Sequence, residues 1–101
     1  MRIISQNKLI SVPFEMTAIH VTGTFIRMNM VGDTGKGTVI AEYSTSEKTE
    51  KAMQLLHESY IVNEIFKKID TKLQLKMLEA VEKEIGLKYG DVFQFPKEEE
   101  L

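Results

Sequence analysis

The stretch Val92-Phe93-Gln94-Phe95-Pro96, close to the C-terminus, decides the fold of this chain. Phe93 and Phe95 alternate with Gln94, which is the period of a β-strand that has one buried face. A long helix-like stretch precedes this strand, so the strand must find its partners in the β-rich first half of the chain. We therefore predict one closed α+β domain over residues 1–96, in which the two chain ends meet.

Composition agrees with a small globular domain. Of the 101 residues, 43% are hydrophobic and 28% are charged, which is sufficient for one modest core. The formal net charge of -2 argues against a long nucleic acid as partner, because such binding requires a clearly basic surface. Negative charge gathers at the C-terminus, where residues 97–101 are predicted to form a loose acidic tail outside the domain.

The sequence also excludes several kinds of chemistry and location. It has no cysteine, which removes disulfides, thiol chemistry and thiolate metal sites. The opening Met1-Arg2-Ile3-Ile4-Ser5 is followed at once by polar residues, unlike a signal peptide. No apolar run approaches the ~20 residues needed to span a bilayer. We therefore expect a cytoplasmic protein that has no membrane partner.

The first half of the chain alternates between β-like runs and turns. Short strands are predicted at residues 2–5, 9–12, 17–21, 24–31 and 38–43, and they pair as antiparallel hairpins. In the strand at 24–31, Ile26, Met28 and Met30 share one face, which we expect to lie in the core. Arg27 and Asn29 lie together on the opposite face.

Two helices are predicted between this sheet and the C-terminal strand. The first begins at Ser44, which forms a capping box with Glu47, and ends near Ile69. The second covers residues 71–85 and ends before Gly86. Both carry more apolar surface than one small sheet covers, so we expect a homo-oligomer. The predicted fold class is α+β, with an N-terminal antiparallel sheet of short hairpins, two helices, and a C-terminal strand that returns to the sheet.

The segment Gly32-Asp33-Thr34-Gly35-Lys36-Gly37 invites comparison with a phosphate-binding loop. A Walker loop needs a lysine followed by Ser or Thr and then a helix, whereas Gly37 follows Lys36 and the next element is a strand. A flexible hairpin loop is therefore the favoured interpretation. From such a loop, Lys36 can still reach a ligand phosphate.

Patterns typical of catalysis and metal binding are weak. His20 and His57 have no HxxxH or HxH spacing, so a structural or surface role is favoured over metal binding. No serine is flanked by nucleophile-elbow glycines, and no pair of carboxylates has an apolar setting suited to acid–base chemistry. Phe93 and Phe95 could stack on bases, but core packing is favoured without a basic surround. We predict no enzymatic activity, no cofactor and no metal site.

Five segments of the chain form a recognisable set: Met1-Arg2-Ile3-Ile4-Ser5-Gln6, Val12-Pro13-Phe14-Glu15, Ala41-Glu42-Tyr43-Ser44-Thr45, Ala52-Met53 with Leu55-Leu56 and Tyr60, and Phe93-Gln94-Phe95-Pro96. This set resembles a group of small proteins encoded by phages and mobile elements of Gram-positive bacteria. The resemblance spans the chain except for residues 61–90. Size, strand-then-helix order and the expected oligomer are also similar to the Thoeris anti-defence proteins. Those are phage sponges that sequester cyclic ADP-ribose signals and, in some members, cyclic oligonucleotides.

The resemblance implies a phage-encoded counter-defence protein that binds and sequesters a small cyclic nucleotide immune signal without catalysis. Arg27, Asn29 and Lys36 are the candidate donors to phosphates, and Tyr43 or Tyr60 is the candidate aromatic for the base. The alternative is a protein–protein interaction module that inhibits or recruits a host protein through its apolar helices. A small hydrolase or transferase ranks last, because no constellation of residues supports it.

Overall fold

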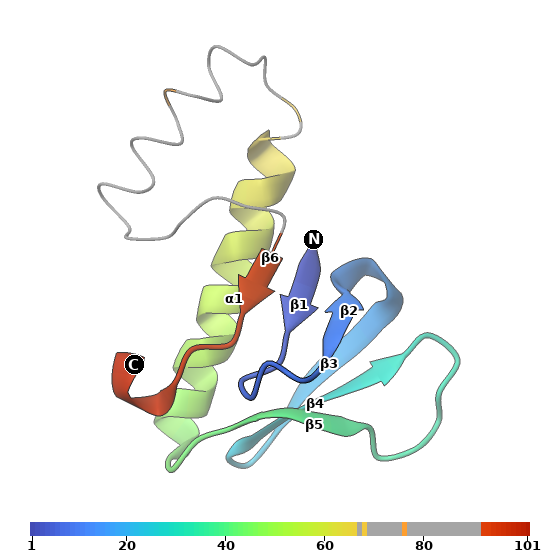
Figure 1. Cartoon of the computed structure of the whole chain (residues 1–101), viewed down its shortest axis with the longest axis vertical. Helices are drawn as coiled ribbons and strands as arrows, with labels where there is room; N and C mark the ends of the chain where they lie inside the picture. The colour runs from blue at the N-terminus through green and yellow to red at the C-terminus, as the bar shows by residue number, and fades with distance from the viewer. Residues whose placement is uncertain (67, 69–75, 77–91) are drawn as a thin grey trace.

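The computed structural model describes residues 1–66, 68, 76 and 92–101. In this part of the chain, two three-stranded sheets and a long helix surround one core (Figure 1). In chain order, the elements are β1 (Arg2–Ile4), β2 (Ser11–Pro13), the 3-10 helix η1 (Phe14–Met16), β3 (Thr17–Thr22), β4 (Phe25–Met30), β5 (Thr38–Glu42), α1 (Ser46–Phe66), β6 (Val92–Gln94) and the 3-10 helix η2 (Glu98–Glu100). The α+β class is confirmed, although the strands divide between two sheets where we predicted one. The second predicted helix, at residues 71–85, lies outside the described residues.

The first sheet brings the two ends of the chain together, in the order β2-β1-β6. Ile3 of β1 is opposite Val12 in antiparallel β2 and opposite Phe93 in parallel β6. The pairing continues past the last residue of β6, because the Phe95 N–H donates to the Ile4 carbonyl at 3.1 Å. The prediction that the C-terminal strand returns to the N-terminal half is therefore confirmed.

The second sheet is an antiparallel meander in the order β3-β4-β5. Gly23, at φ +62°, supplies the left-handed turn residue between β3 and β4. Along β4 the pattern is as predicted, since Ile26 and Met28 are buried while Arg27 and Asn29 lie on the opposite face. One face of this sheet therefore belongs to the core.

A β-bulge in β5 joins the two sheets. Ile26 is opposite Ala41, but the next residue of β4, Arg27, is opposite Val39, so Ile40 is the extra residue. Its carbonyl accepts the Gln6 N–H at 2.9 Å. The Gln6 side chain then accepts the Glu42 N–H at 3.0 Å through Oε1. The loop that leaves β1 is thereby held against the edge of the second sheet.

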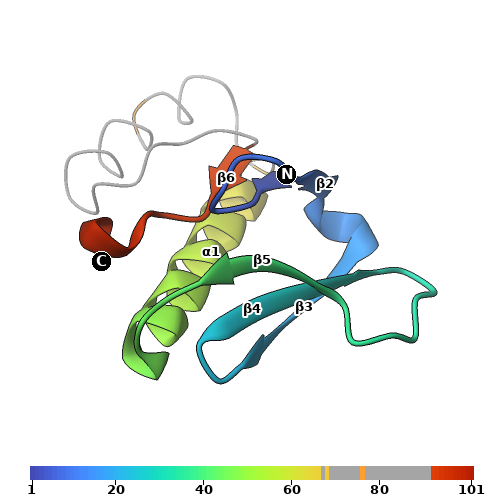
Figure 2. The same ribbon diagram turned by 60° about the horizontal axis from the view of Figure 1, so that its bottom comes forward.

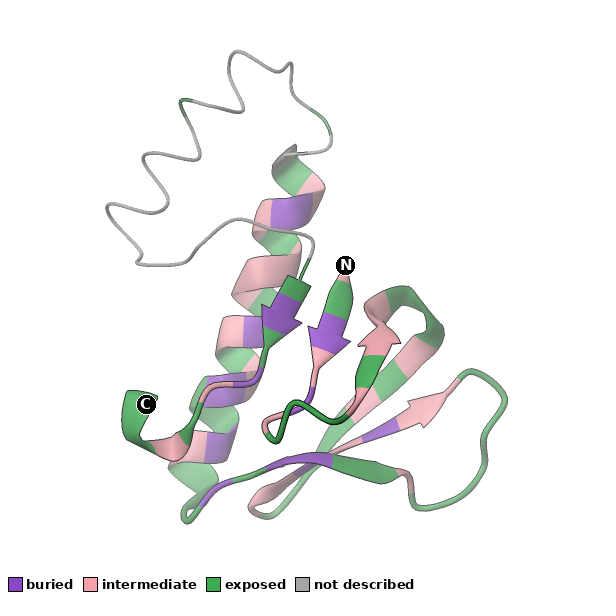
Figure 3. Cartoon of the chain, viewed as in Figure 1, coloured by how far each residue is buried: buried purple, intermediate pink, exposed green. Residues whose placement is uncertain are grey.

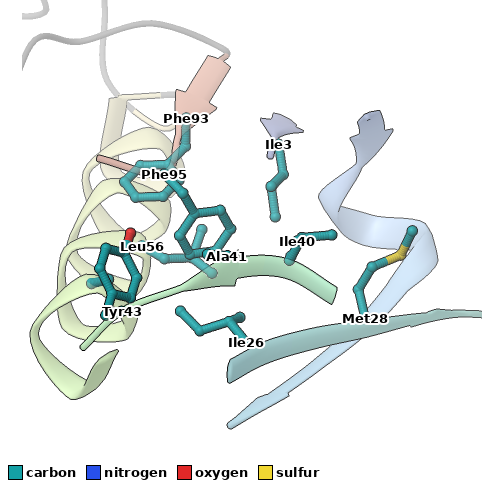
Figure 4. Packing of buried hydrophobic residues seen from close by; sticks show 10 residues of the cluster. Ile3, Ile26, Met28, Ile40, Ala41, Tyr43, Leu56, Phe93 and Phe95 are labelled. Carbon is teal, nitrogen blue, oxygen red and sulfur yellow. The ribbon is translucent and has the colours of Figure 1, made fainter. Parts of the chain in front are cut away.

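The core lies between the two sheets and α1, as Figures 3 and 4 show. Helix α1 contributes Ala52 and Leu56, neither of which is exposed. Phe93 and Phe95 pack edge to face, with ring centroids 5.2 Å apart and planes at 87°. Core packing of the C-terminal aromatics, the favoured interpretation of the sequence, is confirmed. The fully buried residues therefore come from both chain ends and from the middle of the chain.

The start of α1 differs from the prediction. The cap is Thr45, because its Oγ1 accepts the Lys48 N–H at 3.2 Å and its carbonyl accepts the Thr49 hydroxyl at 2.9 Å. The predicted capping box of Ser44 with Glu47 is wrong. The Ser44 N–H instead donates to Glu98 Oε1 at 2.6 Å. The acceptor for this N–H is therefore a carboxylate near the C-terminus, and not the side chain of Glu47. No helix in the described ranges has the length and apolar character required to cross a membrane.

The acidic end, for which we predicted a loose tail, forms the 3-10 helix η2 (Glu98–Glu100). In this helix, the Lys97 N–H donates to Glu100 Oε1 at 3.4 Å, and the Glu100 N–H donates to the Lys97 carbonyl at 3.0 Å. Hydrogen bonds from Ser44, and to a lesser extent the nearby charge of Lys48, lower the pKa of the Glu98 carboxyl below its usual value. The Lys48 Nζ lies 3.7 Å from Glu98 Oε1. Leu101 packs against the core, which gives this segment an apolar anchor as well.

Tyr43 joins the end of β5 to the C-terminal segment. The side chain is buried, and its hydroxyl donates to the Pro96 carbonyl at 2.7 Å. Burial, followed by the charges of Glu100 and Glu98, raises the pKa of Tyr43 to about 12. The folded state therefore favours the neutral phenol, and this contribution to stability is complete below pH 10 and lost as the pH rises toward about 12.

We predict that Tyr43→Phe lowers the free energy of unfolding by about 1–2 kcal/mol, because it leaves the partly buried Pro96 carbonyl without its donor. Urea unfolding at neutral pH measures this loss. The matched control is Tyr60→Phe, which we expect to change stability by less than about 0.5 kcal/mol. Equal losses in the two variants would contradict the assigned role of the Tyr43 hydroxyl.

Candidate functional site

The outer face of the β3-β4-β5 sheet, opposite the core, carries the predicted residues Arg27 and Asn29. Arg27 lies in the central strand, with His20 of β3 on one side and Val39 of β5 on the other. Phe25 precedes it by two residues and therefore shares its face. This arrangement places a cation, an imidazole and an aromatic ring side by side on an open sheet.

The Arg27 guanidinium is held by an aromatic ring. Its Cζ lies 5.5 Å from the centroid of the Phe25 ring, within the range of a cation–π contact. Arg27 is half-buried, and among the described residues it makes no ion pair with a carboxylate. On the same face, the carboxylate of Glu42 belongs to the cross-strand partner of Phe25, and Glu42 makes no ion pair with Arg27. The ring thus orients the guanidinium, and no described residue accepts a hydrogen bond from its N–H donors.

Asn29, a predicted phosphate donor, makes a hydrogen bond within the fold. Its Nδ2 donates to the Gly35 carbonyl at 2.9 Å, so the amide ties β4 to the loop that follows it. A second tie lies nearby, where the Met30 N–H donates to Asp33 Oδ2 at 3.2 Å and the Asp33 N–H donates to the Met30 carbonyl at 3.0 Å. Asn29 therefore positions the loop with one of its two amide N–H donors.

The loop at 32–37 encloses a shallow hollow of about 460 Å³ beside the ends of β4 and β5. Asn29, Thr34 and Thr38 offer polar atoms to the hollow, while Asp33 adds a carboxylate that disfavours an anion there. Lys36 is exposed in the same loop and does not line the hollow. Figure 3 shows most of this loop exposed.

The two predicted tyrosines do not join this face. Tyr43 is in the core, with 3% of its surface exposed. Tyr60 is on α1, where its ring packs against Phe14 at a centroid distance of 4.8 Å. Sequence reasoning missed Phe25 and His20 as residues of this face. The predicted hairpin at Gly23 could have identified them, because a two-residue turn that pairs Thr22 with Phe25 also pairs His20 with Arg27.

Within residues 1–66 and 92–101, together with 68 and 76, histidines and carboxylates form no cluster that could hold a metal ion. His57 is exposed on α1. Comparisons with protein-family models, curated proteins and solved structures find no match to this chain.

The shape of the loop depends on Gly37, which has φ +85° and lies against β4. A Cβ at this position would lie 2.7 Å from Asn29 Oδ1 and 2.8 Å from the Met28 carbonyl oxygen. We predict that Gly37→Ala lowers the free energy of unfolding by about 1–3 kcal/mol. The positive φ is strained for alanine, and the clash of its Cβ with the Met28 carbonyl adds to that cost. Urea unfolding measures the change.

The matched control for this prediction is Gly35→Ala. A Cβ at Gly35 meets nothing within 4 Å, so this variant is expected to stay within about 0.5 kcal/mol of the native chain. If both alanine variants are equally stable, the close packing of the loop on Asn29 is not the constraint described.

Proposed function

We propose that this protein is a phage-encoded counter-defence protein that binds and sequesters a small cyclic nucleotide signal without converting it. The observation that carries the proposal is the half-buried Arg27 guanidinium, held over Phe25 and not paired with a carboxylate in the described part of the chain. The likeness of the bracketing segments 1–6 and 93–96 to small phage proteins supports the biological setting.

Arg27 suits a phosphate for physical reasons. A guanidinium presents a planar fork of N–H donors that matches two phosphate oxygens. The contact with Phe25 restricts the side chain before binding, which reduces the entropy lost when the ligand docks. Lys36, from the exposed loop, adds a second positive charge, and Asn29 fixes the position of that loop. Arg27 and Lys36 together would provide positive charge for one or two phosphate groups.

The base of the nucleotide needs an apolar or aromatic surface. The Phe25 ring and Val39 supply such a surface on the same sheet face as Arg27. This assignment replaces Tyr43, whose hydroxyl is engaged with Pro96, and Tyr60, which packs on Phe14. Binding of this kind needs no acid–base residue, so sequestration follows from affinity and slow release alone.

Isothermal titration calorimetry with a panel of cyclic ADP-ribose isomers and cyclic oligonucleotides tests the proposal. We predict micromolar or tighter binding to one member of the panel, and a loss of roughly 10–100-fold in affinity for Arg27→Ala, because a charge-assisted pair is removed. The matched control is Arg2→Ala, which removes the chain's other arginine from the first sheet, where it bonds to Ser11. Absence of binding to every member, or equal loss in both variants, would overturn the proposal.

A second candidate function is a protein–protein interaction module that inhibits or recruits a host protein. It is favoured by Ile61 and Ile65, which lie one helical turn apart on α1 with 56% and 43% of their surfaces exposed. An apolar pair at this spacing is typical of a helix that docks into a groove.

For this second function, we predict that affinity purification from host cells recovers one stoichiometric partner, and that the double variant Ile61→Asp/Ile65→Asp loses it. Leu9→Asp is the control, because Leu9 is 84% exposed in a distant turn. Retention of the partner by the helix variant would exclude this surface.

A further inference from the structure

The sheet edges of the described chain differ in how they are protected. An unprotected edge offers free N–H and C=O groups to another strand, and proteins usually block it with short strands, prolines, charges or bulges. β2 has three residues and ends at Pro13, and β6 also has three. β5 carries the bulge at Ile40, and Gln6 already bonds to that edge.

β3 is the exception. It has six residues, Thr17–Thr22, with regular pairing to β4 and with no proline, glycine, lysine or carboxylate. Figure 2 shows β3 on the far side of β4 from β5, and its only hydrogen-bonded neighbour in the described sheet is β4. Four of its six residues are exposed, namely Ala18, His20, Val21 and Thr22.

The register of the hairpin shows which groups face the open edge. Thr22 and Phe25 close a two-residue turn, so they form a hydrogen-bonded pair. Hydrogen-bonded pairs alternate along an antiparallel ladder, so His20 and Arg27 form the next one. The N–H and C=O groups of Ile19 and Val21 therefore point away from β4. No hydrogen bond in the described part of the chain occupies them.

We propose that β3 pairs with β3 of a second copy of this chain, antiparallel and with the two-fold axis at His20. Ile19 is then opposite Val21 of the second copy, and Ala18 is opposite Thr22 of the second copy. The two three-stranded sheets become one continuous sheet of six, with both cores on the same side.

A second copy suits this edge for three reasons. Its own β3 has the same length and the same open groups, so all backbone donors and acceptors of Ile19 and Val21 are satisfied. Val21, which is 39% exposed and is opposite the buried Ile26, gains apolar cover on the core-facing side. No carboxylate or lysine within Thr17–Thr22 opposes its own copy, so the pairing carries no fixed like-charge repulsion.

The alternative symmetric register, with the axis at Ile19, is less favourable. It places Val21 opposite Thr17 of the second copy. The Thr17 N–H already donates to the Phe14 carbonyl, so the Val21 carbonyl would lose its donor. The register with the axis at His20 leaves no such group unpaired.

The interface is small, because it consists of one strand edge and its flanking side chains. It falls below the roughly 1,200 Å² that marks standard-size stable interfaces, so we expect a reversible dimer that is populated at roughly 100 μM. Sedimentation velocity over a concentration series measures this association. Val21→Pro is expected to abolish it, since it removes an N–H that points to the open edge and leaves the pairing with β4 intact.

The absence of native cysteine allows a sharper test by cross-linking. Under mild oxidation, His20→Cys should form a disulfide dimer, because paired residues without mutual hydrogen bonds have Cα atoms about 4.5 Å apart, within disulfide range. Ala18→Cys or Thr22→Cys alone should not cross-link, since each is roughly 14 Å along the strand from its own copy. An equal mixture of these two variants should give the mixed disulfide.

Thr34→Cys, in the exposed loop, is the control for random collision. Cross-linking of His20→Cys no faster than this control would overturn the proposal. A monomeric mass at roughly 100 μM would overturn it as well. Cross-linking of Ala18→Cys alone would show a different register and would also contradict the assignment. Because the cysteine variants leave the backbone of β3 unchanged, the test stands even if Val21→Pro does not fold.

Discussion

The parallel pairing of β1 with β6 is the interaction on which the rest of the structure depends. It brings residues separated by almost the whole chain into adjacent strands, with Ile3 opposite Phe93. Once this pair forms, Phe95 enters the core and η2 lies near the start of α1. Glu98 can then bind the Ser44 N–H, and the Tyr43 hydroxyl can donate to the Pro96 carbonyl. One long-range contact therefore organises the core, the helix start and the C-terminal segment together.

The bulge at Ile40 has a comparable role for the second sheet. By removing one residue from the regular pairing, it frees a carbonyl that the loop after β1 requires. It also allows two consecutive residues of β5, Ile40 and Ala41, to be buried. The core-facing side of the β3-β4-β5 sheet is consequently well covered, and the opposite side, which carries Arg27, stays open. The candidate site is thus a consequence of how the two sheets are joined.

Local pattern and long-range contact contributed differently to the candidate site. Alternation along β4 was sufficient to separate Ile26 and Met28 from Arg27 and Asn29. It could not show that the amide of Asn29 is engaged by Gly35, because that contact depends on the path of the loop. Nor could it show that Tyr43 is buried, because the cover over its ring comes partly from residues near the other end of the chain.

By itself, the sequence determined the α+β class, the hairpin at Gly23, the core face of β4 and the strand character of the C-terminal segment, because each depends on residue periodicity or turn chemistry within a few positions. Only the tertiary structure decided that the strands form two sheets and that the Ser44 N–H, just before α1, bonds to a carboxylate of the C-terminal segment. Those features depend on hydrogen bonds between groups far apart in sequence, such as Gln6 with Ile40 and Ser44 with Glu98. Such partners cannot be identified from local propensity, since several donors and acceptors compete for each of them.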